Sequence, residues 1–145
     1  MDLSAATPPT DVLVVDGANV VGSRPDGWWR DRPGAAARLH ARLLSTPELA
    51  LRVVLVLEGR ARSGVPEGVA RGVEVVHARG EGDRKIAEEA SRGLTEGQTV
   101  AVVTADRRLA ADVERLGAKV LRPGWLLDRI GSPSPGGKED DSPIR

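Results

Sequence analysis

The chain has 145 residues, a length that suits one domain with a hydrophobic core. It contains no Cys, which excludes disulfide bonds, zinc knuckles and a thiol nucleophile, and its two His residues are too few for a multi-histidine metal centre. Acidic and basic residues number 21 each, so the zero net charge of the whole chain gives no indication of nucleic acid binding.

The two ends of the chain differ in composition from its middle. Residues 1–10 are expected to form a flexible leader that lacks the basic and apolar segments of a secretion signal. Residues 132–145 are rich in Ser, Pro, Gly and charge, which predicts a disordered tail. The longest stretch without a charged residue has nine residues, whereas a membrane span needs about 20. We therefore expect a cytoplasmic domain over residues 11–131 and no membrane segment.

Short apolar runs alternate with helical patterns along this domain. Apolar runs without polar alternation are typical of strands buried on both faces, and they predict five strands, at 11–16, 51–58, 72–78, 99–105 and 118–121. Apolar residues at helical spacing predict four helices, at 33–45, 83–94, 105–117 and 123–130. The alternation predicts an α/β fold, a single three-layer domain with a mostly parallel central sheet of about four or five strands.

Four acidic residues follow the ends of separate predicted strands. Asp16 and Glu58 end the first and second strands, Asp83 opens the helix after the third, and Asp106 follows the fourth. Ligands of such sheets bind beyond the carboxyl ends of the strands, so we expect the four side chains at one edge. Crowded carboxylates repel one another, and in the absence of Cys and nearby His their oxygens suit Mg²⁺ or Mn²⁺. The alternative for Asp83 and Asp106 is a role as helix N-caps.

Basic residues gather in the loops predicted at the same edge. Ten of the 21 basic residues fall in four loops, at 17–32, 59–68, 79–85 and 105–108. This distribution favours contacts with the phosphates of a polyanion, and the alternative is a salt-bridged surface. The candidates for substrate contacts are Arg24, Arg30, Arg60, Arg84 and Arg107. Trp28 and Trp29 occupy the longest loop, where an indole either stacks on an unpaired base or packs on the core.

Three blocks of this sequence resemble the PIN-like nucleases, and more closely the NYN domains of that superfamily. The blocks are VVDGANVVG at 14–22, GDRKIAEEA at 82–90 and VVTADRRLAADVERLGAKVLRP at 102–123. The resemblance implies a PIN-like ribonuclease fold whose carboxylate cluster binds Mg²⁺ or Mn²⁺. Known members are toxins or RNA-processing enzymes, and the motifs do not distinguish between these roles.

By position, the resemblance also implies roles for individual residues. The implied metal ligands, which are also the catalytic acids, are Asp16, Asp83 and Asp106. Asn19 would hold the substrate phosphate or the metal-bound water, and Thr104 would support the cluster by hydrogen bonding at the substrate site. Glu58 is a fourth candidate ligand, although it ends a strand where the family often brings its glutamate from a helix.

The candidate residues are compatible with three functions. The first is a metal-dependent endoribonuclease that hydrolyses phosphodiester bonds of single-stranded RNA. The second is hydrolysis of nucleoside triphosphates or another small phosphate at the same metal centre. The third is a non-catalytic RNA-binding domain, in which the acids only cap helices and binding depends on salt rather than on metal. The expected partners are RNA and either a second copy of the chain, in a homodimer, or a protein regulator.

Overall fold

The strands form one sheet in the computed structural model, which describes residues 10–24 and 26–131. The order across the sheet is β3-β4-β2-β1-β5-β6. The strands are β1 (Val12–Asp16), β2 (Arg52–Leu57), β3 (Gly68–Ala70), β4 (Val73–His77), β5 (Val100–Val103) and β6 (Lys119–Leu121). All neighbouring strands are parallel except β3 and β4, which are antiparallel. The predicted tail lies outside the described residues, as does the predicted leader apart from Thr10.

The five strands predicted from apolar runs are all present, but the prediction of four or five strands was too low. The sixth strand is β3, a three-residue edge strand whose residues are all exposed. Because an exposed edge strand buries no side chain, it has no apolar run by which the sequence could reveal it. Its Val69 is 71% exposed, in contrast to the buried valines of the central strands.

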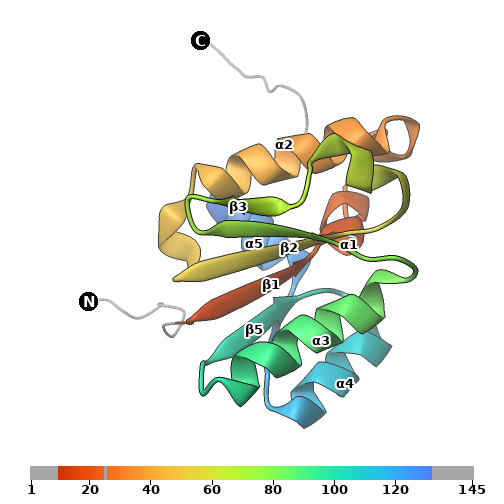
Figure 1. The fold of residues 1–145 in the computed structure, drawn as a ribbon. Coiled ribbons are helices and arrows are strands. Elements are labelled where there is room, and N and C mark those ends of the chain that lie inside the picture. Colours follow the sequence, from red (N-terminus) through yellow and green to blue (C-terminus); the bar gives the residue numbers. More distant parts are fainter. Residues whose placement is uncertain (1–9, 25, 132–145) are drawn as a thin grey trace.

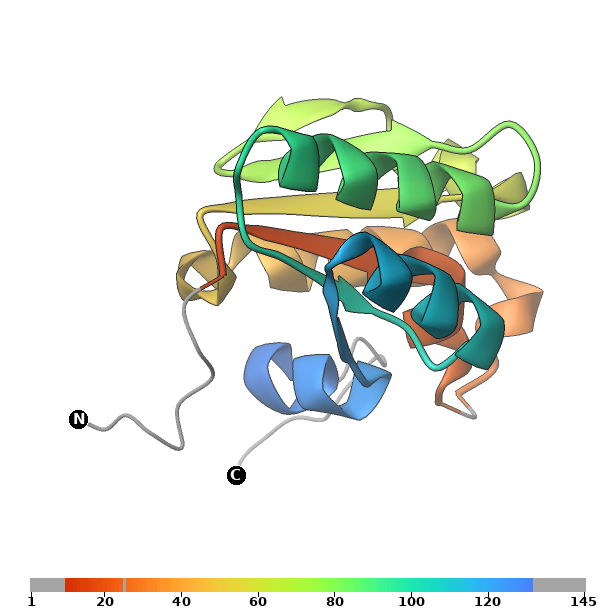
Figure 2. The ribbon, with the colours of Figure 1, turned by 90° about the horizontal axis from the view of Figure 1, so that it is seen from below.

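Helices cover both faces of the sheet, which gives the predicted three layers (Figures 1 and 2). The helices are α1 (Gly17–Gly22), α2 (Arg32–Leu44), α3 (Gly82–Thr95), α4 (Arg107–Leu116) and α5 (Pro123–Ile130), with short 3₁₀ helices η1 (Trp28–Arg30), η2 (Pro47–Leu49) and η3 (Gly59–Gly64). The first, second and fifth helices pack on one face, and α3 and α4 pack on the other. None of the helices in the described residues is long and apolar enough to cross a bilayer.

Strand β1 shows why the central strands are continuously apolar. Leu13 and Val15 belong to the core beneath α1, α2 and α5. Val12 and Val14 point the other way, into the core beneath α3 and α4. Since successive side chains of a strand alternate between faces, burial of both faces requires an apolar residue at every position.

The sheet reverses its direction of winding at β1. After β1 the chain adds β2 and then β4 on one side, and α3 returns it to β5 on the other side of β1. In open parallel sheets, ligands bind beyond the carboxyl ends of the strands at such a switch point. A ligand site is therefore expected among the residues that follow β1 and β5.

The segment after β1 begins with a helix, whereas the sequence predicted a loop over all of residues 17–32. Helix α1 begins directly at Gly17, and Asp16 is its N-cap. A Cβ atom on Gly17 would lie 2.7 Å from the backbone oxygen of Val56, so only a glycine allows α1 to start this close to β2. A helix of six residues has too few apolar positions for its periodicity to be recognised from the sequence.

Candidate active site

Four acidic residues lie at the carboxyl ends of the strands, each on a different connection. Asp16 is the last residue of β1, and Glu58 directly follows β2. Asp83 is the second residue of α3, and Asp106 is the N-cap of α4. This convergence follows from the topology, because the parallel strands β1, β2, β4 and β5 all deliver the chain to the same end of the sheet.

Asp16 is buried within a hydrogen-bond network that joins the ends of β1 and β5. Its side chain is only 6% exposed. The hydroxyl group of Thr104 donates a hydrogen bond to Asp16 Oδ2 at 2.9 Å, and the backbone N–H of Asn19 donates to Oδ1 at 3.2 Å. The N–H of Asp106 donates to Thr104 Oγ1 at 3.1 Å, and the N–H of Ala105 donates to Asn19 Oδ1 at 2.8 Å. The network holds two of the four acids at fixed positions.

The environment of Asp16 disfavours its charged form. Burial raises the pKa of this carboxyl group from its ordinary 3.8 to about 6, and the negative charges of Asp83 and Glu58 add to the increase. The hydrogen bonds from Thr104 and from the Asn19 backbone act in the opposite direction. A buried carboxylate that is crowded by two others is a site where a cation would relieve both burial and repulsion.

Asp83 belongs to the same electrostatic cluster. Burial raises its pKa above the ordinary value, and the charges of Asp106, Glu81 and Glu58 raise it further. The guanidinium group of Arg108 partly compensates by lowering the pKa of Asp83. The four predicted acids are therefore close enough to influence one another, and Arg108 is the cation that the structure brings to them.

The helix-cap alternative holds for Asp106 but not for Asp83. Asp106 Oδ1 accepts hydrogen bonds from the N–H groups of Arg108, at 2.9 Å, and Leu109, at 3.0 Å. The N-cap position of α3 belongs to Glu81, whose side chain makes no capping hydrogen bond. Instead, Glu58 Oε1 accepts a hydrogen bond of 2.7 Å from the N–H of Gly82, which ties the end of β2 to the start of α3.

The donor set fits a hard divalent cation in its chemistry. Across the described residues, no hydrogen bond engages either carboxylate oxygen of Asp83 or the second oxygen of Asp106 and of Glu58. These oxygens are therefore available as ligands, and Mg²⁺ and Mn²⁺ prefer such ligands. No three acidic or histidine side chains among residues 10–24 and 26–131 stand close enough to hold one ion in the conformation described.

The contact between Gly82 and Glu58 gives a first prediction, for the variant Gly82→Ala. A Cβ atom at this position would collide with Glu58 Oε1, so the variant is expected to displace the carboxylate and to lose its hydrogen bond. We expect the free energy of unfolding in urea to fall by about 1 kcal/mol. Gly80→Ala is the matched control, because a Cβ atom there meets open space. Equal losses in the two variants would contradict the proposed contact.

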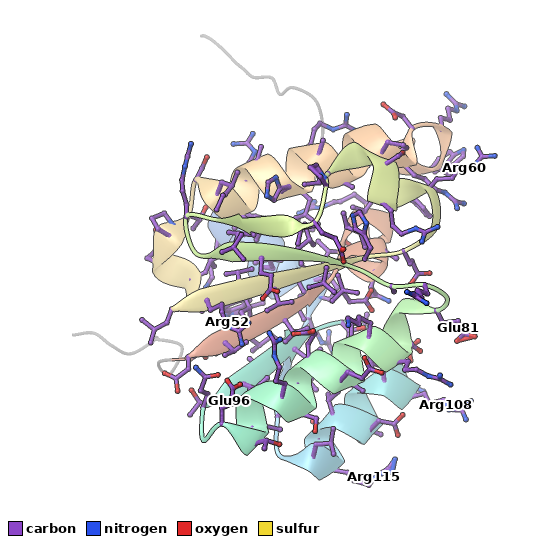
Figure 3. All side chains as sticks on the ribbon, in the orientation of Figure 1. Arg52, Arg60, Glu81, Glu96, Arg108 and Arg115 are labelled. Atoms are coloured by element: carbon purple, nitrogen blue, oxygen red, sulfur yellow. The ribbon has the colours of Figure 1, made fainter. Side chains whose placement is uncertain are left out.

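A groove of about 780 Å³ opens beside Asp83, and both basic and acidic side chains line it. Its basic lining residues are Arg79, Arg84, Lys85 and Arg108. Lys85 is paired with Glu88 at 3.7 Å, whereas in the described part of the chain neither Arg79 nor Arg84 makes an ion pair. Figure 3 shows Arg60, Glu81 and Arg108 at this end of the molecule, opposite Arg52 and Glu96.

Arg84 is thus the predicted substrate arginine that lines the groove, and Arg108 lines it where the prediction named Arg107. Both residues follow the N-cap of α4 and are exposed, so composition does not distinguish them. The helical rotation between adjacent residues, about 100°, decides which of the two faces Asp83. That rotation, counted from the buried Leu109, is the signal that could have selected Arg108.

The other predicted arginines lie outside this groove. Arg60 is exposed on η3, and Arg24 is half-buried between α1 and η1. Arg30 is exposed and lies 5.8 Å from the ring centroid of Trp29, which is itself 52% exposed. Trp28 packs partly against the core, so the two neighbouring indoles differ in environment.

The structure defines a single α/β domain, in which a six-stranded, mostly parallel sheet lies between two layers of helices. No family model matches the sequence, and no curated protein matches it. Solved structures with a similar fold include Rae1 (YacP) from Bacillus subtilis. A mutant of Rae1 superimposes with a TM-score of 0.60 at 19% identity, over 85% of this chain and 76% of that chain. Unmutated Rae1 gives a TM-score of 0.58 at 20% identity, over 85% and 75% of the two chains.

Proposed function

We propose that this protein is a metal-dependent endoribonuclease of the NYN type that hydrolyses phosphodiester bonds of single-stranded RNA. The observation that carries the proposal is the convergence of Asp16, Glu58, Asp83 and Asp106 at the switch point of the sheet. Burial and neighbouring negative charges raise the pKa of Asp16 and of Asp83, and a bound cation would relieve both effects. The PIN-like fold and the three NYN-like sequence blocks agree with this use.

The four carboxylates would hold Mg²⁺ or Mn²⁺ in this proposal. Such an ion, when bound, lowers the pKa of a water molecule and stabilises the oxygens of the phosphodiester. Thr104 keeps the carboxylate of Asp16 oriented toward the site through its 2.9 Å hydrogen bond. Asn19 is held by the N–H of Ala105, which leaves its amide N–H₂ group to donate to a substrate phosphate.

The groove favours a polymeric substrate over a small phosphate. It is open to solvent, and Arg79 and Arg84 line it together with Asp83. Basic residues spaced along an open groove suit successive phosphates of one strand, whereas a nucleoside triphosphate usually occupies a concave, enclosing pocket. We therefore propose RNA as the partner, and a homodimer or a protein regulator stays a prediction.

The test is cleavage of a mixed-sequence single-stranded RNA by the purified protein with Mg²⁺ or Mn²⁺, and again with EDTA. We expect cleavage that requires the ion. Asp83→Asn and Asp106→Asn are each expected to reduce the rate at least about 100-fold, because even residues behind metal ligands contribute about 10- to 100-fold. Asp128→Asn is the matched control, since Asp128 is an exposed acid on α5.

Other outcomes of this assay favour the two alternative functions. Full activity of both asparagine variants would refute the assignment of the carboxylates. Salt-sensitive RNA binding without turnover, equal with and without chelator, would favour an RNA-binding domain. Release of phosphate or pyrophosphate from nucleotides, with RNA left intact, would favour a hydrolase of small phosphates.

A further inference from the structure

A second, smaller pocket lies next to Glu58, between α1, η1, α2 and η3. Its volume is about 180 Å³, and its lining includes Glu58 and the two residues that follow Asp16. The pocket therefore shares Glu58 with the acid cluster and opens next to it. Nothing in the arrangement of the carboxylates requires a cavity here, so the pocket needs its own explanation.

The walls of this pocket are mostly apolar and include one aromatic ring. They are formed by Val21, Trp28, Ala36 and Ala61. The Trp28 indole lies next to α1, since a Cβ atom on Gly22 would be at van der Waals distance from the ring, 3.5 Å. An indole beside small aliphatic side chains is a surface on which a flat ring stacks.

Two charged groups border the apolar walls. The guanidinium carbon of Arg32 lies 5.4 Å from the centroid of the Trp28 ring, and the Glu58 carboxylate lines the pocket on the side of the acids. Arg32 offers only hydrogen-bond donors and Glu58, when ionised, only acceptors. A ligand with an apolar face and an edge that carries both donors and acceptors complements this combination.

We infer that this pocket binds one nucleobase of the RNA, adjacent to the phosphate that lies at the carboxylates; the inference rests on the proposed function. The size of the pocket supports a base rather than a whole nucleotide, because pockets for complete small-molecule ligands measure about 300–1,000 Å³. The ribose and phosphate then remain outside, toward Asp16 and Asp83. Bases that are taken out of a strand are held in this manner, by stacking and by contacts to their polar edge.

The pocket can be tested without any cleavage, by NMR titration in the presence of EDTA. The probes are AMP, GMP, CMP and UMP, with ribose 5-phosphate as the probe that lacks a base. We expect at least one nucleotide to shift the Trp28 indole N–H signal and to bind about tenfold more tightly than ribose 5-phosphate, since stacking of one base changes affinity by roughly 5- to 100-fold. The Trp125 indole, on α5, serves as an internal reference.

Ala61→Leu is designed to fill the pocket. In this variant, the preference for a nucleotide over ribose 5-phosphate is expected to fall to less than about twofold. Ala41→Leu, the same change at an exposed position of α2 outside the pocket, is expected to retain it. Ala18→Leu narrows the pocket from α1 at an exposed position, and it replaces Ala61→Leu if that variant does not fold. Equal binding of ribose 5-phosphate and all four nucleotides, an unmoved Trp28 signal, or an unchanged preference in the filled variant would overturn the inference.

The RNA assay separates failure of this inference from failure of the proposed function. The wild type and Ala61→Leu could cleave RNA at the same positions and bind nucleotides without regard to the base. This result would overturn the base-binding inference and leave the proposed ribonuclease function standing. Base-dependent binding that Ala61→Leu removes, in a protein that cleaves no RNA, would support the pocket and contradict the ribonuclease. If the pocket selects a base during cleavage, Ala61→Leu is expected to cleave at a broader set of nucleotides than the wild type.

Discussion

Asp16→Asn is expected to stabilise the folded protein at pH 7.5 while it removes metal-dependent activity. The carboxyl group of Asp16 has a pKa of about 6 in the folded protein, compared with an ordinary value of 3.8. The folded state therefore binds this proton more tightly than the unfolded state does. Ionisation of Asp16 opposes folding, and an asparagine avoids that cost because it carries no charge.

The sign and size of the effect follow from this difference in pKa. Between pH 3.8 and about 6 the folded state holds more protons than the unfolded state, so the contribution of Asp16 to stability falls as the pH rises through this window. Above pH 6 the full difference applies, and a pKa difference of about two corresponds to roughly 3 kcal/mol. The asparagine amide fits the Thr104 hydroxyl less well, at a cost of about 1 kcal/mol, so we expect a net gain of about 2 kcal/mol at pH 7.5.

Urea unfolding of both proteins at pH 4 and pH 7.5, in EDTA, measures this effect. The advantage of the variant should be present at pH 7.5 and absent at pH 4. Asp128→Asn, an exposed acid on α5, is expected to change stability by less than about 0.5 kcal/mol at either pH. If Asp16→Asn is less stable than the wild type at pH 7.5, then ionisation of Asp16 does not destabilise the folded protein in the absence of an ion.

Added Mn²⁺ extends the same experiment to the metal site. An ion that binds only the folded state stabilises it by about 2.7 kcal/mol at 100 times its dissociation constant. We expect this gain for the wild type and little of it for Asp16→Asn, so that the order of stability of the two proteins reverses. Equal stabilisation of both would mean that the ion binds elsewhere.

Much of the fold was predictable because its decisive signals are local. Burial of both sheet faces makes each central strand a continuous apolar run, and β1 and β5 were recognised on that basis. Asp16 ends the first of these runs and Asp106 directly follows the predicted run at 99–105, so their position at the carboxyl edge followed from the parallel topology alone. The same locality explains the failure at β3, whose three exposed residues have no burial pattern.

The features that the sequence did not predict depend on contacts between distant segments. The pocket beside Glu58 is assembled from α1, η1, α2 and η3, none of which contains a recognisable motif for it. The choice between Arg107 and Arg108 depends on how α4 is rotated against α3. The hydrogen bond from the Gly82 N–H to Glu58 joins residues that are 24 positions apart, and neither residue type reveals its partner in the sequence.

Thr104→Val is the second substitution with a large expected effect, because Thr104 connects two of the acids. Its hydroxyl group donates to Asp16 Oδ2 at 2.9 Å and accepts from the N–H of Asp106 at 3.1 Å, and the residue is 1% exposed. Valine has nearly the same shape but leaves both partners without their hydrogen bond. Loss of a hydrogen bond to a buried charged group costs about 1.5–3 kcal/mol, and we expect a loss of about 2–3 kcal/mol at pH 7.5.

The pH dependence distinguishes this mechanism from a simple packing defect. The Thr104 hydrogen bond lowers the pKa of Asp16, so its removal raises that pKa above about 6. The cost of Thr104→Val should therefore be larger at pH 7.5, where Asp16 is charged, than at pH 4, where it is protonated. Thr104→Ser keeps the hydroxyl group and loses only a methyl group, so it is expected to cost about 1 kcal/mol at both pH values. The contrary result is a loss of stability that is the same for Thr104→Val and Thr104→Ser and the same at pH 4 and pH 7.5. In that case Thr104 acts through packing, and other groups stabilise the charge of Asp16.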